Sequence, residues 1–304
     1  MTFPRSLAPA ALVVLAFLLI YVPIYLPRAQ AQANSVSTDL NLTFTTIDVP
    51  GAVITSVQGI NMTGDMVGYY GEANTGPASG FLLSNGNFTL FDYPGGNSTY
   101  AFGINDSGLI SGSAFVRQST AAVSFLYDGT TFTTVRAPGK SSTRAVGINN
   151  AGTIAGAYGT LSIGRGFMLR GTQFKTLSPP GNFLYVSATG INNLGGVVGW
   201  TIGDSDSGFF YKGGQFQTVS FPGASQTLAW GINDSGIIVG WYEKGPPFAD
   251  HGFALVKGKY ISLDYPGASQ TLAFGINASG QIVGSYTFDG QTFHGFVTNP
   301  IAAD

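Results

Sequence analysis

The sequence predicts an all-β protein, a six-bladed β-propeller of four-stranded antiparallel blades. One observation is a Gly-Ile-Asn tripeptide that recurs six times at intervals of 41–44 residues, which is the length of one propeller blade. Another is composition, since 44 glycines and only 9% charged residues are typical of many short strands joined by tight turns. Pro-Gly pairs and phenylalanines also recur in step with the tripeptide. The six tripeptides begin at Gly59, Gly103, Gly147, Gly190, Gly231 and Gly275.

Each repeat contains four predicted strands, most clearly the fifth. Residues 227–233 alternate large apolar side chains with small ones, the period of two expected of a strand. Three further strand-like segments follow at 236–242, 251–256 and 259–266, each bounded by turn residues. Short links between the third and fourth strands, such as the Asn-Gly pair at Asn85, supply the positive φ angles of tight hairpins. The repeat is therefore predicted to be an antiparallel meander.

The two ends of the chain predict how the ring closes. The last repeat stops after its third strand, residues 294–298, whereas the first tripeptide is preceded by an additional strand within residues 42–50. We expect this N-terminal strand to complete the last blade, because closure hides an edge that would otherwise promote aggregation. The predicted boundaries are a leader over 1–33, a linker over 34–41, the propeller over 42–298 and a tail over 299–304.

The first residues predict export. Arg5 is followed by an apolar run over residues 7–26 and by small residues in an Ala-x-Ala pattern around Ala31, which is typical of a secretory signal peptide. The run is also long enough for one membrane span, so an uncleaved anchor is the alternative, and only then is a membrane a partner. We expect the protein to be extracellular, periplasmic or on the cell surface.

Composition excludes several classes of function. Arg5 and Arg28 belong to the leader, so 11 of the 13 basic residues follow it, against 15 acidic ones. They are scattered along the chain, whereas nucleic-acid binding takes about 6–10 phosphate contacts from a basic face. The chain has no cysteine, which excludes thiol catalysis and thiolate metal ligands. No motif indicates a cofactor, and we expect neither a cofactor nor a nucleic-acid partner.

The repeated tripeptide is interpreted as the start of a turn rather than as a reactive site. In residues 231–236, Asn233 is expected to accept backbone hydrogen bonds and Gly236 to adopt the left-handed conformation that ends the turn. The two residues between them vary among repeats, while the asparagine and the glycine do not. Another glycine, four residues later in every repeat, is predicted to allow close packing of blade on blade.

The combined motif resembles a known family. Gly-Ile-Asn-x-Ser-Gly-x-Ile-Val-Gly-x-Tyr, His-Gly-Phe and Asp-Tyr-Pro-Gly, seen best in the fifth and sixth repeats, are similar to the HAF family of bacterial extracellular repeat proteins. The resemblance covers residues 42–298. It is looser in the third and fourth repeats, where other residues precede Pro-Gly and the histidine is missing. It implies a bacterial, exported repeat protein and supplies no catalytic residues.

Ligand contacts are predicted on one face of the ring. Links from the second strand to the third, and from each blade to the next, share a face and differ among repeats, and binding residues concentrate in such variable loops on a rigid scaffold. Aromatic side chains near this face can stack on a sugar or a peptide, the alternative being that they pack between blades. The predicted ligand-binding residues are Tyr69, Tyr70, Tyr158, Trp200, Trp241, Tyr242 and Tyr286.

Other chemistries have weaker signals. Asp204 and Asp206 resemble the start of a calcium-binding loop, but its third acid and terminal glutamate are missing, so no metal site is predicted. His251 and His294 lack a partner at the spacing of a zinc motif. Loop carboxylates suited to hydrolysis exist, but no sequence spacing marks a pair. These carboxylates belong to Glu72, Glu243, Asp250 and Asp289.

The sequence therefore favours a non-catalytic binding or interaction module outside the cytoplasm, with a polysaccharide or another cell-surface protein as the candidate partner. Two alternatives stay open. One is a carbohydrate-active hydrolase or lyase that uses loop carboxylates, and the other is a structural protein of the cell envelope tethered by its leader. Turnover of a bound glycan would distinguish the hydrolase from the binding module.

Overall fold

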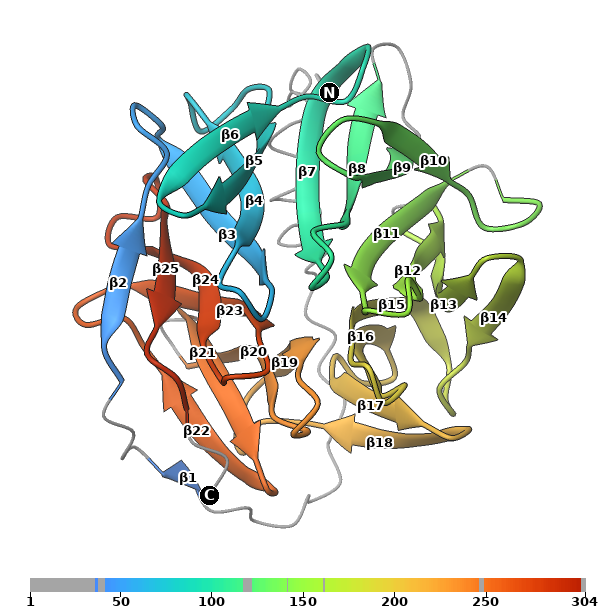
Figure 1. Cartoon of the computed structure of the whole chain (residues 1–304). Helices are drawn as coiled ribbons and strands as arrows, with labels where there is room; N and C mark the ends of the chain where they lie inside the picture. The colour runs from blue at the N-terminus through green and yellow to red at the C-terminus, as the bar shows by residue number, and fades with distance from the viewer. Residues whose placement is uncertain are drawn as a thin grey trace, which may run out of the picture.

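Six antiparallel sheets surround a central axis in the computed structural model, as Figure 1 shows. The structure describes residues 36–37, 42–116, 122–140, 142–160, 162–245 and 249–301, and the predicted leader over 1–33 lies outside them. All the regular elements in these ranges are strands, which confirms the six-bladed β-propeller. Within the same ranges no helix is long and apolar enough to cross a membrane.

Blades 1 to 5 each consist of consecutive strands. Blade 1 contains β3 (Ile54–Ile60), β4 (Met66–Gly71), β5 (Ser79–Ser84) and β6 (Asn87–Phe91). Blade 2 contains β7 (Gly96–Ile104), β8 (Ile110–Val116), β9 (Ala122–Tyr127) and β10 (Phe132–Val135). Blade 3 contains β11 (Thr143–Ile148), β12 (Ile154–Gly159), β13 (Gly164–Arg170) and β14 (Gln173–Leu177). Blade 4 contains β15 (Phe183–Ile191), β16 (Val197–Gly203), β17 (Gly208–Lys212) and β18 (Gln215–Val219). Blade 5 contains β19 (Gln226–Ile232), β20 (Ile238–Lys244), β21 (Ala249–Val256) and β22 (Lys259–Leu263).

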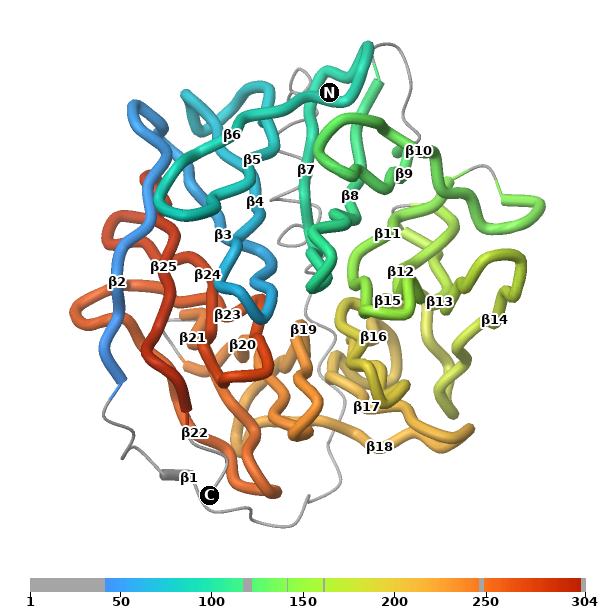
Figure 2. Tube along the Cα trace, in the orientation of Figure 1, coloured from blue at the N-terminus to red at the C-terminus, as the bar shows by residue number. Residues whose placement is uncertain are grey.

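Blade 6 combines the two ends of the chain. It contains β23 (Gln270–Ile276), β24 (Ile282–Thr287), β25 (His294–Thr298) and, as its outer strand, β2 (Phe44–Ile47). Strand β2 pairs antiparallel with β25 from Phe44 opposite Thr298 to Ile47 opposite Gly295. Figure 2 shows this as a blue segment of the tube running beside a red one. The predicted closure by the N-terminal strand is therefore confirmed.

A short strand also lies inside the predicted linker. Strand β1 (Val36–Ser37) pairs in parallel with β22, with Val36 opposite Tyr260 and Ser37 opposite Ile261. The sheet of blade 5 consequently has five strands. The linker thus approaches the outer edge of blade 5 before the chain enters blade 6.

The Gly-Ile-Asn segment forms the predicted turn. In blade 3, Oδ1 of Asn149 accepts hydrogen bonds from the backbone nitrogens of Ala151 at 3.1 Å and Thr153 at 2.9 Å. Gly152 has a φ of 71°, the left-handed conformation that glycine tolerates best. The turn requires a side-chain oxygen that accepts backbone hydrogen bonds and a residue that tolerates the left-handed conformation. Asparagine and glycine meet these requirements, which explains why both recur in every repeat.

The same asparagines also link the blades, which the sequence pattern did not predict. Nδ2 of Asn149 donates to the carbonyl oxygen of Asn192 in the next blade at 3.0 Å. Equivalent bonds run from each blade to the next, and the last returns from Asn277 to Asn61 at 3.1 Å. The six turns therefore form one closed ring of hydrogen bonds. Its donors are Asn61, Asn105, Asn149, Asn192, Asn233 and Asn277.

Two sets of glycines have different packing roles. A Cβ on Gly190, in the inner strand of blade 4, would lie 2.5 Å from the carbonyl oxygen of Trp230 in blade 5. Glycine at this position lets adjacent inner strands approach each other. A Cβ on Gly240, in the second strand, would instead lie 2.0 Å from the carbonyl oxygen of Leu228 and 2.9 Å from the Phe253 ring, both in blade 5. This second glycine therefore serves packing within a blade, which corrects the expected contact of blade on blade.

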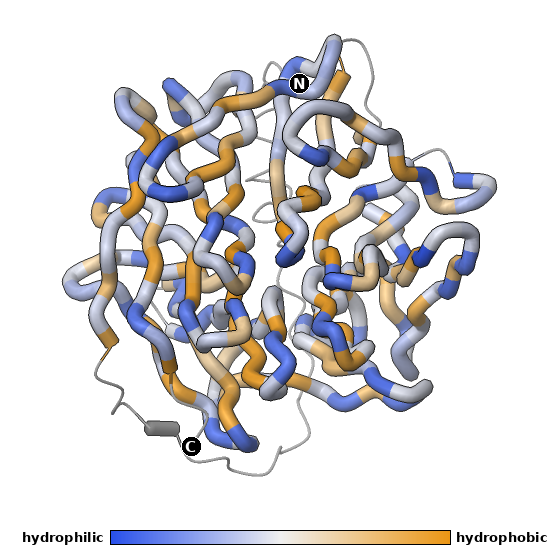
Figure 3. Tube along the Cα trace, in the orientation of Figure 1, coloured by the Kyte–Doolittle hydropathy of each residue, from blue (hydrophilic) through white to orange (hydrophobic). Residues whose placement is uncertain are grey.

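The hydrophobic core lies between neighbouring blades. One phenylalanine in the third strand of each blade fills the gap beside the second-strand glycine, and five of the six have no exposed surface. Figure 3 shows hydrophobic residues along the strands and hydrophilic residues concentrated at the turns. Burial of such a ring stabilises the fold by about 1.5–3 kcal/mol. The six rings belong to Phe81, Phe125, Phe167, Phe209, Phe253 and Phe296.

Candidate functional site

The variable links emerge together on what we call the loop face. Because consecutive strands of a blade are antiparallel, links from second to third strand and from blade to blade lie at one end. The asparagine turns and the hairpins between third and fourth strands lie at the other end, the turn face. Described parts of the loop face include residues 72–78, 178–182, 204–207 and 288–293.

Four of the predicted ligand-binding aromatics are buried. Trp200, Trp241, Tyr242 and Tyr286 are each only 4–5% exposed. The Trp200 ring stacks on Tyr185 within blade 4, with centroids 5.2 Å apart. This burial favours the alternative interpretation, in which these side chains pack between blades.

The two buried tyrosines lie under aromatic residues of the preceding blade. The ring of Tyr242 stacks on Phe221 with a centroid distance of 3.6 Å, and that of Tyr286 stacks on Tyr265 at 3.5 Å. Phe221 and Tyr265 belong to the links that enter blades 5 and 6. The aromatic residue before each of these two Pro-Gly pairs thus anchors the link onto the next blade.

The other three predicted aromatics are half-buried. The Tyr69 ring meets Tyr100 of blade 2 edge to face, with centroids 5.0 Å apart, and burial raises the pKa of Tyr69. The ring of Tyr158 lies 5.0 Å from Nζ of Lys140, a cation–π contact. Tyr70 packs against a core cluster of blades 1 and 6. The structure therefore does not gather the seven predicted residues into one site.

The two aspartates of the calcium-like loop bond to nearby backbone. Oδ2 of Asp204 accepts a hydrogen bond from the nitrogen of Asn182 at 2.9 Å, and Oδ1 of Asp206 accepts one from Gly203 at 3.2 Å. Both carboxylates thus hold the loop face of blade 4 together. In the part of the chain that the structure describes, no three histidine, aspartate or glutamate side chains are grouped to hold a metal ion.

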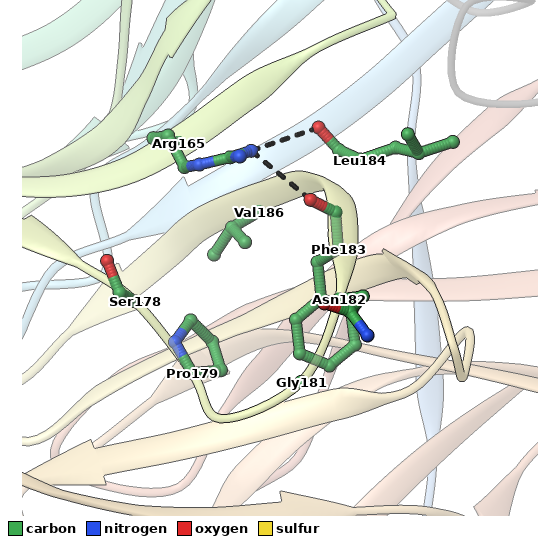
Figure 4. Close-up of a pocket in the computed structure, with 8 residues that line it drawn as sticks. All are labelled: Arg165, Ser178, Pro179, Gly181, Asn182, Phe183, Leu184 and Val186. Atoms are coloured by element: carbon green, nitrogen blue, oxygen red, sulfur yellow. Dashed lines mark hydrogen bonds between the residues drawn. The ribbon is translucent and has the colours of Figure 1, made fainter.

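A cavity of about 290 Å³ lies on the loop face between blades 3 and 4 (Figure 4). Its wall combines the start of β13, the link 178–182 and the start of β15. Most of its lining is apolar or backbone, with one cationic and two neutral polar side chains. The lining residues are Arg165, Ser178, Pro179, Gly181, Asn182, Phe183, Leu184 and Val186.

Arg165 is the charged group of this cavity. Its Nη1 donates to three carbonyl oxygens, those of Gly164 at 2.9 Å, Phe183 at 3.3 Å and Leu184 at 3.2 Å. Figure 4 shows the bonds to Phe183 and Leu184 reaching across to blade 4. A guanidinium has five N–H donors, and those on Nε and Nη2 have no acceptor among the described residues. Among the described residues, the guanidinium is therefore held in place by Nη1 alone.

A second arginine contacts Tyr185, the residue that follows Leu184 in β15. Nη2 of Arg144, in the inner strand β11, donates to the hydroxyl of Tyr185, and the guanidinium lies 5.2 Å from the centre of that ring. A Cβ on Gly164 would lie 2.4 Å from the same ring, so Tyr185 packs directly beside the backbone that precedes Arg165. Burial lowers the pKa of Arg144 to about 10. Among the described residues neither arginine forms a salt bridge.

The basic character of this region has a signal in the sequence that is local to one repeat. Six basic residues lie between Arg136 and Lys175, and no acidic residue occurs from 129 to 203. This local excess does not appear in the net charge of the whole chain, because the acidic residues of other blades offset it. The basic residues are thus concentrated around blade 3 rather than scattered, and a count repeat by repeat would have found them.

Both histidines form pairs with aspartates on the outer strands. In blade 5, Nδ1 of His251 lies 2.9 Å from Oδ1 of Asp264, whose other oxygen accepts a bond from Ser262 at 2.9 Å. Ser262 Oγ in turn lies 3.0 Å from the hydroxyl of Tyr242, on which the His251 ring stacks. The histidine is thus held in one orientation by a packed and hydrogen-bonded cluster.

Blade 6 repeats this arrangement with residues from both chain ends. Nδ1 of His294 lies 2.9 Å from Oδ2 of Asp48, and the hydroxyl of Tyr286 lies 2.9 Å from Oγ1 of Thr46. Asp48 and Thr46 come from the N-terminal segment, so this cluster fastens the closing strand. The Asp-Tyr-Pro motif of blade 5, and Asp-Val-Pro at the same position in blade 6, are therefore partners of His-Gly-Phe in space.

One pair of loop carboxylates does come together. Glu243 in β20 lies directly opposite Asp250 in β21, which puts both side chains on the same face of blade 5. Asp250 is 7% exposed, and its pKa is raised to about 7, first by burial and then by the charge of Glu243, with His251 acting in the opposite direction. The structure thus places next to each other two of the four acids that the sequence could not pair.

None of the protein-family models matches this chain, and no curated protein is significantly similar to it. Solved structures do match. The β-propeller domain of the Trilobed protease from Pyrococcus furiosus is 6% identical, with 82% of this chain and 94% of that one covered and a TM-score of 0.50. A neuraminidase-like protein of A/little yellow-shouldered bat is 14% identical, with 86% and 98% covered and a TM-score of 0.50. A third protein, assigned as a gluconolactonase, is 12% identical, with 86% and 94% covered and a TM-score of 0.50.

The likeness to these structures establishes the class of the protein and not its activity. All three identities are far below 25%, so the similarity concerns the fold. The chain is a six-bladed β-propeller closed by its N-terminal strand. Propellers host unrelated functions, so the function has to be argued from the side chains of the loop face.

Proposed function

We propose that this protein is exported and acts outside the cytoplasm as a non-catalytic binding module, with its ligand on the loop face between blades 3 and 4. The cavity of about 290 Å³ carries the proposal. It lies among links that differ from repeat to repeat, and the polar side chains of Arg165, Ser178 and Asn182 line it together with the apolar side chains of Phe183, Leu184 and Val186. That composition is typical of sites for small ligands or for one unit of a polymer.

The rigidity of the cavity supports a binding role. Arg165 connects its two walls, since it belongs to blade 3 and bonds to the carbonyl oxygens of Phe183 and Leu184 in blade 4. The link between these blades is further held by Asp204, which accepts a bond from the backbone of Asn182. A site that is already ordered loses less conformational entropy when a ligand binds.

Export and family membership form part of the same proposal. They rest on the basic start, the apolar run over residues 7–26 and the Ala-x-Ala pattern, and on the resemblance of the repeats to the HAF family. Mass spectrometry of the protein recovered outside the cytoplasm would test export. We expect an N-terminus near residue 34, whereas an intact leader in the membrane fraction would support the tethered alternative.

A glycan array tests the binding role. We expect the mature protein to bind a subset of polysaccharides without releasing products. Ser178→Trp, which fills the cavity, should remove binding, while Ser235→Trp in an exposed turn on the opposite face should leave it intact. Product release would favour the hydrolase, and absence of binding to any glycan or cell-surface protein fraction would contradict the module.

A second candidate function has one specific observation in its favour. Asp250 has a pKa raised to about 7 and lies opposite Glu243, and a pair of carboxyl groups of which one has a raised pKa is used in glycoside hydrolysis. If the protein hydrolyses a polysaccharide, Asp250→Asn should abolish turnover without removing binding at the Arg165 cavity. Unchanged turnover in this variant would exclude Asp250 as the acid.

A further inference from the structure

We propose that the cavity between blades 3 and 4 binds a carboxylate-bearing ligand, whose carboxylate pairs with the guanidinium of Arg165 through Nε and Nη2. This inference rests on the proposed binding function and specifies the chemistry of its ligand. The carboxylate can belong to a free organic acid or to a uronate residue of an acidic polysaccharide. Both sources present the same planar anion to the arginine.

The donor geometry of Arg165 carries the proposal. All three of its hydrogen bonds come from Nη1, and each acceptor is a neutral carbonyl oxygen at 2.9–3.3 Å. These bonds orient the guanidinium but do not neutralise it. The N–H groups on Nε and Nη2 are parallel, and two parallel N–H donors match the two oxygens of a carboxylate. The arginine is thus already oriented for a bidentate anion.

The charges around the cavity also favour an anion. Arg144, whose guanidinium contacts Tyr185, adds a second positive charge to this region without a carboxylate partner among the described residues. An acid does lie near the cavity wall, because Oδ2 of Asp204 is 3.7 Å from a Cβ built on Gly181, but this oxygen accepts the bond from the backbone of Asn182. Among the described residues, neither guanidinium therefore has a carboxylate partner, and the carboxylate of Asp204 already accepts a backbone hydrogen bond.

Neutral groups of the cavity suit the remainder of such a ligand. Ser178 and Asn182 present hydroxyl and amide groups at the rim, and both residues are exposed. The side chain of Leu184, whose carbonyl oxygen Arg165 contacts, is 59% exposed. A ligand with hydroxyl groups and an apolar face beside its carboxylate, as in a uronate, matches these contacts.

Binding measured by calorimetry tests the inference. The probes are an oligogalacturonate, its methyl ester as the uncharged match, and 4-methylpentanoate as a free organic acid. We expect the mature protein to bind one of the acids, to bind the ester at least about tenfold more weakly, and to lose affinity as salt screens the pair. Preference for the oligomer identifies the polysaccharide as the source, and preference for 4-methylpentanoate identifies the free acid.

Three variants separate recognition from folding. Arg165→Gln should weaken binding at least about tenfold, and Ser178→Glu should do the same while leaving the three Nη1 bonds of Arg165 in place. Arg170→Gln is the matched control, because it removes an exposed charge from the turn face of the same strand. Thermal unfolding checks that Ser178→Glu and the control stay folded.

The outcomes distinguish this inference from the proposed function. Equal affinity for the acid and its ester would contradict a carboxylate-bearing ligand, and so would acid binding that Arg165→Gln and Ser178→Glu leave unchanged. Neither result would contradict the proposed binding function. If neither acid binds but another ligand of the array does, the carboxylate proposal is likewise wrong and the binding function is retained. If no ligand of any charge binds, the proposed function itself fails.

Discussion

Nδ2 of Asn277 donates a 3.1 Å hydrogen bond to the carbonyl oxygen of Asn61, and this bond joins the last repeat to the first. Five equivalent bonds join the other neighbours, so the six asparagines form a ring of donors around the axis. Each side chain thus has two tasks, since its oxygen shapes the turn while its nitrogen couples the blades. A residue with only one of these abilities would not replace it.

Substitution of one ring asparagine separates these tasks. Asn149→Asp keeps an oxygen for the turn but removes the donor to Asn192, so we expect a loss of about 1–3 kcal/mol in the free energy of unfolding. Asn149→Ala removes both and should cost more. Urea unfolding measures both values, with Ser235→Ala, at an exposed turn position, as the control. Equal stability of Asn149→Asp and the parent would show that the ring bonds do not hold the blades together.

Removal of the closing strand should prevent folding. A chain that starts at residue 51 lacks β2, Asp48 and Thr46 and leaves β25 as an open edge, so we expect aggregated or insoluble protein. A chain that starts at residue 42 keeps these contacts and serves as the control. Size-exclusion chromatography of the soluble fraction reports the result, and a folded monomer from the shorter chain would contradict the importance of closure.

Substitution by alanine should reduce the free energy of unfolding by different amounts at the two kinds of glycine. Gly240→Ala would bring Cβ to 2.0 Å from the carbonyl oxygen of Leu228, so we expect a loss above about 4 kcal/mol. Gly236→Ala meets nothing within 4 Å and suffers only from its φ of 80°, which costs about 1–2 kcal/mol. Thermal unfolding compares the two. Similar losses would mean that backbone conformation, and not crowding, explains why both positions are glycine.

The buried carboxyl of Asp250 should make stability depend on pH. Its pKa rises from an ordinary value of 3.8 to about 7 in the folded protein, so the folded state holds this proton more tightly than the unfolded chain. Stability is then lost as the pH rises from about 4 to 7 and changes little above that range. Between pH 5 and pH 8 the parent should lose about 3 kcal/mol relative to Asp250→Asn. Parallel stability curves for the two proteins would contradict the raised pKa.

The architecture was largely predictable because its determinants are local. The period of the Gly-Ile-Asn segments, the turn chemistry of Asn233 and Gly236 and the alternation within each strand all act over a few residues. Together they define six meanders, and the additional strand before the first repeat defines the closure. The residues that stay the same in all six repeats are those that a turn or a close backbone approach requires. Their structural role could therefore be predicted from the sequence.

The candidate site was not predictable in the same way, because it depends on contacts between repeats. Trp200 and Trp241 are aromatic residues of the kind that line binding surfaces, yet both are buried in the folded ring. Arg165 belongs to no motif in the sequence. Its orientation in the cavity depends on hydrogen bonds to the carbonyl oxygens of Phe183 and Leu184 in the next blade. The sequence by itself determined the number, order and closure of the blades. Tertiary structure decided which side chains face solvent and which polar groups converge, since burial and charge pairing are set by neighbours distant in the chain.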